Sequence, residues 1–400
     1  MPVLGGWFLR AASRGRVCRF GIQTLSEHEE TVMSSQMDRV RSGRSPRPLQ
    51  VAVTHARSAL GQAVAEQLIR AGEQVTGVDQ RSGTAGGLRL RWRLTDLESP
   101  QVVDALRGIE AVVHPAHGVD LRNELAEDPQ ARRARMIREV QTLTVAAAAA
   151  GVSHVVVLSS AMVYGARQDN PVPLAEDSPL RSADVEGMIA DLVEVEELLD
   201  TARRVHPSVR ITSVRPAAIV GPGVDSIITR HFEAPRMLVL KGTEPHWQFC
   251  HVEDLGSAVA TVLHDGLGPA VAVGAPGSLT QEQVEQLSGL RHVSVAPTAA
   301  HGAADRLHRL GVLPLPPTDL AYISHPWVIE PVTLLEHGWR PAYDNAACLA
   351  TLLEEARTGA GATVRRLERR DAALGAAGAA SAAVAVVATA ALLRRRRRRT

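Results

Sequence analysis

Between residues 49 and 214, short apolar runs alternate with longer stretches of helical periodicity, and this alternation constrains the fold more than any other feature. Repeated strand–helix units are typical of a parallel sheet with helices on both faces. We therefore predict an α/β fold with a doubly wound parallel sheet for residues 50–222, to which residues 247–275 return. The predicted strands are 50–54, 74–78, 88–94, 111–114, 154–159 and 209–214, and the predicted helices are 59–70, 131–150 and 185–204.

The turn after the first strand, Thr54 to Gly61, lies where a dinucleotide-binding sheet carries its glycine-rich loop. Only the last of the three glycines is present, because His55 and Ser58 stand at the other two positions. A Cβ at position 58 crowds a pyrophosphate, and His55 must avoid a positive φ or bear a cost of about 1 kcal/mol. The helix N-terminus still offers its N–H groups to an anion.

Asp79 ends the second strand, 18 residues beyond Gly61. A carboxylate there accepts hydrogen bonds from a ribose 2′-OH and repels a 2′-phosphate, so NAD is favoured over NADP. The alternative is an ordinary strand–turn–helix with no ligand. The residues expected to contact the cofactor are Thr54, Ala56, Ser58, Ala59, Leu60, Gly61, Asp79, Arg81, Asp96, Leu97, Pro115 and Ala116.

Two residue counts restrict the chemistry. The chain has three tyrosines and a single lysine, Lys241. A tyrosine four residues before a lysine is ruled out, since residue 237 is Met. The three cysteines are scattered and show neither a disulfide framework nor zinc-ligand spacing, so we expect no metal site and a reducing, cytoplasmic location.

Charge is distributed unevenly. Residues 1–50 carry a net charge of +4 and residues 365–400 carry +8, which leaves −11 for the central residues 51–364. An acidic body argues against binding of nucleic acid. Residues 1–48 do not look folded: they read as a disordered leader that resembles a transit peptide, or translation starts at Met33 or Met37.

The C-terminal segment 359–400 is rich in Ala and Arg. Residues 372–393 form a stretch of 22 uncharged residues with arginines on both sides, long enough to span a bilayer. Twelve of them are Ala, so the alternative to membrane association is a low-complexity tail.

Four motifs resemble the extended short-chain dehydrogenase/reductase family, the NAD-dependent epimerase/dehydratases. They are VVVLSSAMVYG at 155–165, VRPAAIVGPG at 214–223, QFCHVEDL at 248–255 and HGWRP at 337–341. The resemblance covers roughly residues 50–358, and within the family it is closest to an actinobacterial epimerase-like branch.

The resemblance implies a Rossmann-like lobe formed by residues 49–222 and 247–275. A smaller substrate lobe then comprises residues 223–246 and 276–358. It further implies a nucleotide-sugar or similar small-molecule substrate and hydride transfer at nicotinamide. A Ser, a Tyr and a Lys four residues after the Tyr then carry the chemistry. A homodimer is also expected.

Carried over residue by residue, most of this catalytic set is missing. Ser160 matches the family's serine, but Met188 and Leu192 stand at the Tyr and Lys positions, where we expect them to face the cleft. Glu139 replaces a frequent Asn. His114 and His117 are the nearby candidates for a substitute proton carrier, because histidine titrates near neutral pH.

Other residues of the motifs are expected to have structural roles. The alternative role for Ser160 is structural, as a buried hydroxyl that is hydrogen-bonded to the backbone. We expect a packing or supporting role, at the sheet and at the junction of the two lobes, for Tyr164, Arg215, Cys250, His251, Glu253 and Asp254. The alternative role for Arg215 is a contact with a substrate phosphate. Glu186 is a further, less favoured candidate for an acid/base residue.

Three functions remain open. The first is an NAD(P)-binding epimerase/dehydratase-like protein without standard catalysis. The second is a working epimerase or reductase with substituted acid/base residues. The third is a membrane-tethered interaction protein with an empty pocket.

Overall fold

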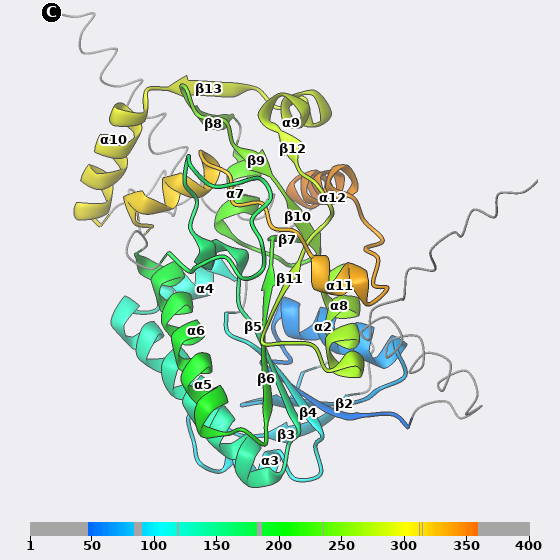
Figure 1. Cartoon of the computed structure of the whole chain (residues 1–400). Coiled ribbons are helices and arrows are strands. Elements are labelled where there is room, and N and C mark those ends of the chain that lie inside the picture. Colours follow the sequence, from blue (N-terminus) through cyan, green and yellow to red (C-terminus); the bar gives the residue numbers. More distant parts are fainter. Residues whose placement is uncertain are drawn as a thin grey trace, which may run out of the picture. The chain divides into compact units, whose positions relative to one another are not determined.

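Seven parallel strands form the central sheet, in the order β11-β6-β5-β4-β1-β2-β3 (Figure 1). The computed structural model describes residues 47–83, 90–117, 120–181, 186–234, 236–311, 313 and 315–358. The strands are β1 (Gln50–Thr54), β2 (Gln74–Asp79), β3 (Arg91–Leu94), β4 (Ala111–Pro115), β5 (His154–Leu158), β6 (Arg210–Pro216) and β11 (Ala270–Val273).

Helices cover both faces of this sheet because its strands are apolar on both sides. In β1, Val51 and Val53 belong to one buried cluster and Ala52 to the other, as the alternation of side chains along a strand requires. Helices α2 (Ala59–Arg70) and α8 (Val252–Asp265) pack together on the first face. The opposite face is covered by α3 (Val102–Ala105), α5 (Pro129–Ala150) and α6 (Gly187–Val205).

The remaining elements follow the carboxyl ends of the strands and include three two-stranded sheets, β10-β7, β12-β9 and β13-β8 (Figure 1). The strands of these small sheets are β7 (Ala218–Val220), β8 (Met237–Leu240), β9 (His246–Trp247), β10 (Phe249–His251), β12 (Leu279–Thr280) and β13 (His292–Val295). The remaining helices are α4 (Leu121–Ala126), the 3-10 helix η1 (Ala161–Tyr164), α7 (Ile227–Glu233), α9 (Gln281–Ser288), α10 (Pro297–Arg309), the 3-10 helix η3 (Pro317–Ile323), α11 (Val332–Glu336) and α12 (Asn345–Thr358).

The predicted doubly wound parallel sheet is confirmed, including the return of residues 247–275, since α8 packs on α2 and β11 pairs with β6. The third strand begins at Arg91, and residues 84–89 lie outside the described part. Residues 1–46 and the tail 359–400, with its candidate membrane segment 372–393, also lie outside it. Among the described helices, none combines the length and apolar character needed to cross a bilayer.

The junction of α8 with the last helices depends on Asp254, whose carboxylate accepts hydrogen bonds from Ala342 N (2.7 Å) and Tyr343 N (3.0 Å). His251 caps α8 and stacks on Tyr343 at a ring separation of 3.7 Å. These contacts agree with the supporting role expected for both residues.

A buried ion pair joins α6 to the sheet. Arg215 on β6 makes two hydrogen bonds to Glu196, at 2.8 and 3.0 Å, and a third to the Tyr164 hydroxyl at 2.9 Å. Ser213 donates to the same carboxylate at 2.6 Å. Burial opposes the charge on Glu196, but these donors lower its pKa below the ordinary value. Arg215 therefore supports the sheet, and Tyr164 packs in the core.

This pair generates a stability prediction. Arg215→Met should lower the free energy of unfolding by about 3–5 kcal/mol, because the Glu196 carboxylate is left buried without its partner. Urea denaturation measures the loss. Arg133→Met is the matched control, since Arg133 pairs with Glu194 on the same helix but is 60% exposed, and a much smaller loss is expected. Equal losses in the two variants would contradict this account.

Candidate functional site

The strand order places a ligand-binding position between β1 and β4. The chain runs from β1 to β2 on one side of β1 and returns to β4 on the other. In open parallel sheets, ligands bind outside the carboxyl ends of the strands at such a switch point. Two segments leave the sheet there: the turn 55–58 after β1 and residues 116–117 after β4.

The turn after β1 is closed by its own hydrogen bonds. Ser58 donates its N–H to His55 O (2.9 Å), and its hydroxyl accepts from Gly61 N (3.0 Å) as the N-cap of α2. A Cβ on Gly61 would lie 2.3 Å from His55 O, so only glycine fits there. The Ser58 hydroxyl therefore satisfies an N–H group that a glycine at this position would leave to a bound anion.

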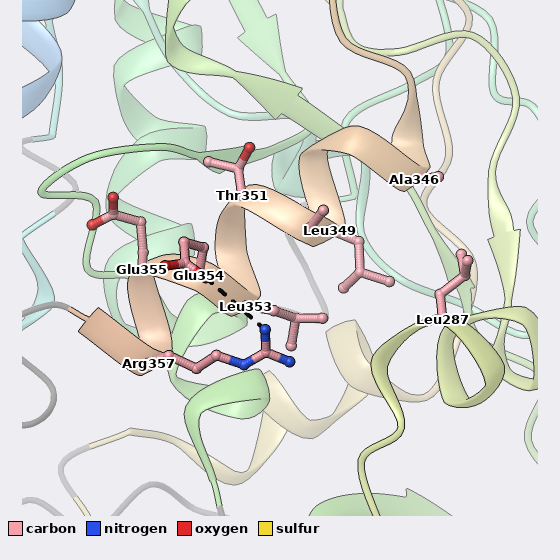
Figure 2. Close-up of a pocket in the computed structure, with 9 residues that line it drawn as sticks. Leu287, Ala346, Leu349, Thr351, Leu353, Glu354, Glu355 and Arg357 are labelled. Atoms are coloured by element: carbon pink, nitrogen blue, oxygen red, sulfur yellow. Dashed lines mark ion pairs between the residues drawn. The ribbon is translucent and has the colours of Figure 1, made fainter.

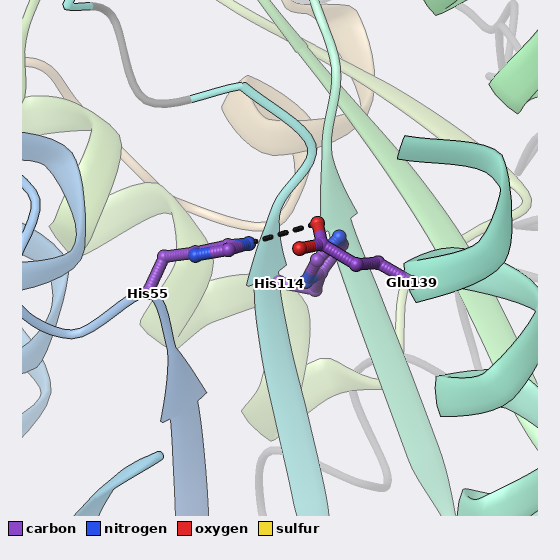
Figure 3. A group of neighbouring side chains, drawn as sticks. All are labelled: His55, His114 and Glu139. Atoms are coloured by element: carbon purple, nitrogen blue, oxygen red, sulfur yellow. Dashed lines mark hydrogen bonds and ion pairs between the residues drawn. The ribbon is translucent and has the colours of Figure 1, made fainter. Parts of the chain in front are cut away.

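His55 has a φ of 47°, and among the described residues it is the only one other than glycine with a positive φ. Its side chain reaches α5 on the other face of the sheet, where Nε2 lies 3.1 Å from Glu139 Oε2 (Figure 3). Arg135 approaches the same oxygen at 3.3 Å. Burial alone would raise the pKa of Glu139, but the hydrogen bond and charge of His55, with His114 and Arg135, lower it to about 2. A charged carboxylate therefore bridges to His55 across the switch point.

His114 lies next to this bridge and is only 1% exposed. Its ring is 5.4 Å from that of His55, and its Nδ1 is 2.7 Å from Thr54 Oγ1. Burial, with the nearby His55, lowers the pKa of His114 to about 3. The expectation that His114 carries protons near neutral pH is therefore not supported. His117 is half-buried, with Nδ1 4.0 Å from Glu124.

The other predicted cofactor residues line the same edge or support it. Asp79 ends β2 and accepts a hydrogen bond from Arg57 N (3.2 Å), and Asp96 is exposed and caps Glu98 N (3.1 Å). The exposed Arg81 follows β2, and Ala59 begins α2. The side chains that face the core are Thr54, Ala56, Leu60, Leu97, Pro115 and Ala116.

The structure places the expected catalytic residues at the start of η1 and on α6. Ser160 caps η1, and its hydroxyl accepts a hydrogen bond from Met162 N at 3.2 Å. This backbone contact corresponds to the structural alternative for Ser160. Met188 is half-buried in the first turn of α6. Leu192 was expected to face the cleft; instead it is 3% exposed and lies in the core cluster that α5 and α6 share.

Asp319 is a site candidate that the sequence did not reveal. It lies in η3, is 7% exposed, and burial together with Glu186 raises its pKa to about 8 despite the opposing Arg132. Glu186 stands at the N-terminus of α6, and the Tyr322 hydroxyl ties η3 to Met162 O of η1 (2.8 Å). The Pro-rich stretch 313–317 carries no motif that could have indicated a buried acid here.

A groove of about 550 Å³ lies away from this site, along α12 and α9 (Figure 2). Its walls are mainly Leu287, Leu349 and Leu353, and Glu354 and Arg357 form an ion pair at its edge. It contains none of the predicted site residues, so we assign it no role in the chemistry considered below.

The switch point fits a dinucleotide only in part. Asp79, Gly61 and the N-terminus of α2 match the adenosine side. The His55–Glu139 contact joins the turn after β1 to α5 at this switch point, and the Ser58 hydroxyl accepts a hydrogen bond from a helix N–H group, that of Gly61. The adenosine side of the site therefore fits NAD, whereas the turn after β1 leaves fewer free N–H groups for a pyrophosphate.

The buried Asp319 generates a pH prediction. Its pKa is about 8 in the folded chain, against an ordinary value of 3.8, so the folded state holds a proton that the unfolded state has lost. Stability should therefore fall as pH rises from about 4 to about 8. Relative to the unmodified chain, Asp319→Asn should gain stability by about 1 kcal/mol for each pH unit between pH 5 and pH 8. Denaturant unfolding at both pH values tests this. Asp305→Asn, at a carboxylate whose side chain is 46% exposed, is the control. A stability difference between Asp319→Asn and the unmodified chain that does not change with pH would contradict the prediction.

Comparisons with known proteins agree with this architecture. An uncharacterized protein of Mycobacterium tuberculosis strain H37Rv, Rv0501, is 25% identical over 252 residues, which cover 62% of this chain and 66% of that protein, just under two thirds of its length. The UDP-glucose 4-epimerase of Thermotoga maritima, solved with UDP-glucose, has a TM-score of 0.58 at 18% identity, covering 77% of this chain and 98% of its own. DesIV of Streptomyces venezuelae, a dTDP-glucose 4,6-dehydratase solved with NAD, has a TM-score of 0.57 at 19% identity, covering 78% and 98%.

These structural similarities establish the fold. The family itself is shown by the sequence, because the model of the NAD-dependent epimerase/dehydratase family matches residues 51–274, more than half of the chain. The chain belongs to the NAD-dependent epimerase/dehydratase family.

Proposed function

We propose that this chain is a binding member of its family that does not carry out hydride transfer. The observation that carries the proposal is the pair of apolar residues on α6, Met188 and Leu192, where the family resemblance places Tyr and Lys. Neither side chain donates a hydrogen bond or moves a proton. The single lysine of the chain, Lys241, follows β8 and not α6, so it does not replace the missing one.

The proposed ligand is a nucleotide sugar or a related small molecule. Support comes from the solved relatives, one of which holds UDP-glucose and another of which is named a dTDP-glucose dehydratase. NAD is proposed as a weak second ligand. The Asp79 carboxylate at the end of β2 favours it over NADP, whereas the His55–Glu139 bridge opposes the pyrophosphate.

The chain's own residues define what this site does in the proposal. His114 stays neutral and buried, Ser160 holds the start of η1, and Glu139 keeps its charge paired with His55 and Arg135. These groups maintain the shape of the edge of the sheet without moving a proton.

A second candidate function is an enzyme with a substituted general acid. The observation in its favour is Asp319, because a carboxyl group with a pKa of about 8 is protonated at neutral pH. It lies near Glu186 at the N-terminus of the helix that normally supplies the catalytic pair.

An activity measurement separates the two candidates. With NAD and UDP-glucose, UDP-galactose or dTDP-glucose, the unmodified chain should turn over at least about 10⁴-fold more slowly than an active family epimerase assayed in parallel, because general acid/base groups contribute 10²–10⁴-fold each. Chromatography of the sugar nucleotides measures this. Turnover within about 100-fold of the active enzyme would refute the binding role, and its loss in Asp319→Asn would establish the second candidate.

The proposed weak binding of NAD is tested separately. His55→Gly relieves the positive φ and removes the bridge, so NAD affinity measured by calorimetry should rise about tenfold or more. Adding Asp79→Ala to that variant should remove the preference for NAD over NADP. His337→Gly, at an exposed histidine that ends α11, is the control and should leave affinity unchanged. Tight NAD binding by the unmodified chain, equal to that of His55→Gly, would show that the bridge does not oppose the cofactor.

A further inference from the structure

We propose that His55, His114 and Glu139 form a binding site for a divalent transition-metal ion of the zinc type. The three residues come from the turn after β1, from β4 and from α5, and they converge at the carboxyl edge of the sheet (Figure 3). Each offers one donor atom, and the three donor atoms all lie within 4.8 Å of one another.

His114 provides the observation that points to a ligand. Its Nε2 is buried and has no hydrogen-bond partner among the described residues. Thr54 Oγ1 lies 2.7 Å from His114 Nδ1 and 3.4 Å from Val113 O, to which its hydroxyl donates. We assign the ring proton of His114 to Nδ1 on this pattern, which leaves a lone pair on Nε2. A ligating histidine characteristically donates its other ring N–H in this way, because the bond fixes the tautomer and the ring orientation.

The other two donors already have the spacing of metal ligands. Three ligands about 2.0–2.1 Å from a tetrahedral Zn²⁺ lie about 3.3–3.5 Å apart. His55 Nε2 and Glu139 Oε2 are 3.1 Å apart, and Glu139 is 5% exposed, so its charge is held in place. The His114 donor atom lies within 4.8 Å of the other two, so closing to the ligand spacing around a bound ion requires a shift of about 1 Å, which the partly exposed His55 side chain can make.

The donor types select the ion. Two imidazoles and one carboxylate suit Zn²⁺ or Co²⁺, whereas Mg²⁺ and Ca²⁺ prefer oxygen ligands. The His55 side chain is 31% exposed, so the ion reaches the site from solvent and a fourth position stays open. The positive charge of Arg135, which pairs with Glu139 at 3.3 Å, opposes the binding of a cation. Arg135 also pairs with Glu127 at 2.9 Å and can keep that partner when the ion binds Glu139.

This inference is independent of the proposed function, because it requires neither NAD nor turnover. Bound metal replaces the His55–Glu139 hydrogen bond with two coordination bonds and so strengthens the same bridge. Metal binding and NAD binding are therefore expected to compete.

The test uses the untagged full chain, stripped with a chelator and titrated with Zn²⁺ by calorimetry and with Co²⁺ by absorption spectroscopy. We expect one equivalent of each ion, visible absorption bands of four- or five-coordinate Co²⁺, and no binding of Mg²⁺. Glu139→Gln and His55→Gly should each weaken Zn²⁺ binding at least about 100-fold, and Thr54→Val, which acts only through His114, about 10–100-fold.

His154→Ala is the matched control. Like His114, His154 is buried on the sheet and bonded to a threonine, Thr212 at 2.9 Å, and its variant should bind Zn²⁺ as the unmodified chain does. Circular dichroism shows whether each variant is folded. If the variants of buried residues unfold, His55→Gly still tests the proposal, because residue 55 lies in a turn. Absence of Zn²⁺ binding by the folded unmodified chain, or equal binding by His55→Gly, overturns the proposal.

Discussion

The buried charge of Glu139 is the interaction on which the edge of this sheet depends. A carboxylate that is 5% exposed is costly unless it is paired, and here His55 and Arg135 compensate for the loss of water. The pairing explains why His55 is held at a positive φ, a conformation that costs a side chain about 1–2 kcal/mol. The shape of the turn after β1 therefore follows from a charge on a helix that lies across the sheet.

Two separate departures from the family lead to the same interpretation. On α6, Met188 and Leu192 provide no acid/base pair, and at the switch point the turn carries His55 and Ser58 in place of glycines. We propose that the first departure removes the means to transfer a proton and that the second opposes a pyrophosphate. The seven-stranded sheet and the buried Glu196–Arg215 pair are both present, so the proposed change concerns the use of the edge and not the fold.

The sequence predicted the sheet well because strand and helix periods are local properties. The helix 59–70 and the strand 50–54 match the structure residue by residue, since Ser58 caps the helix and Val51 to Val53 form a buried apolar run. The helix predicted from residue 131 begins at Pro129, and Asp128 before it was the capping signal that the prediction overlooked. Other strand ends shifted by one or two residues, as where β2 extends to Asp79 and β6 to Pro216, and the third strand begins at Arg91 and not at residue 88.

The site was less predictable because it is built from distant residues. The sequence marks Glu139 only as a replaced Asn and His114 only as a candidate proton carrier, whereas the contact between Glu139 and His55 spans 84 residues of sequence. Leu192 was expected at a cleft, but the direction of a helical side chain depends on what packs beside it, here the core under α5. The buried Asp319 sits in a segment without periodicity, so only the packing around it reveals its raised pKa.

We propose that the His55–Glu139 bridge opposes a dinucleotide pyrophosphate at the switch point between β1 and β4. A crystal structure of the unmodified full chain, grown with a large excess of NAD, tests it most directly. The account predicts that the His55–Glu139 contact persists and that no pyrophosphate is ordered between the turn after β1 and α5. An ordered pyrophosphate on the N-terminus of α2, with His55 rotated away from Glu139, would contradict it.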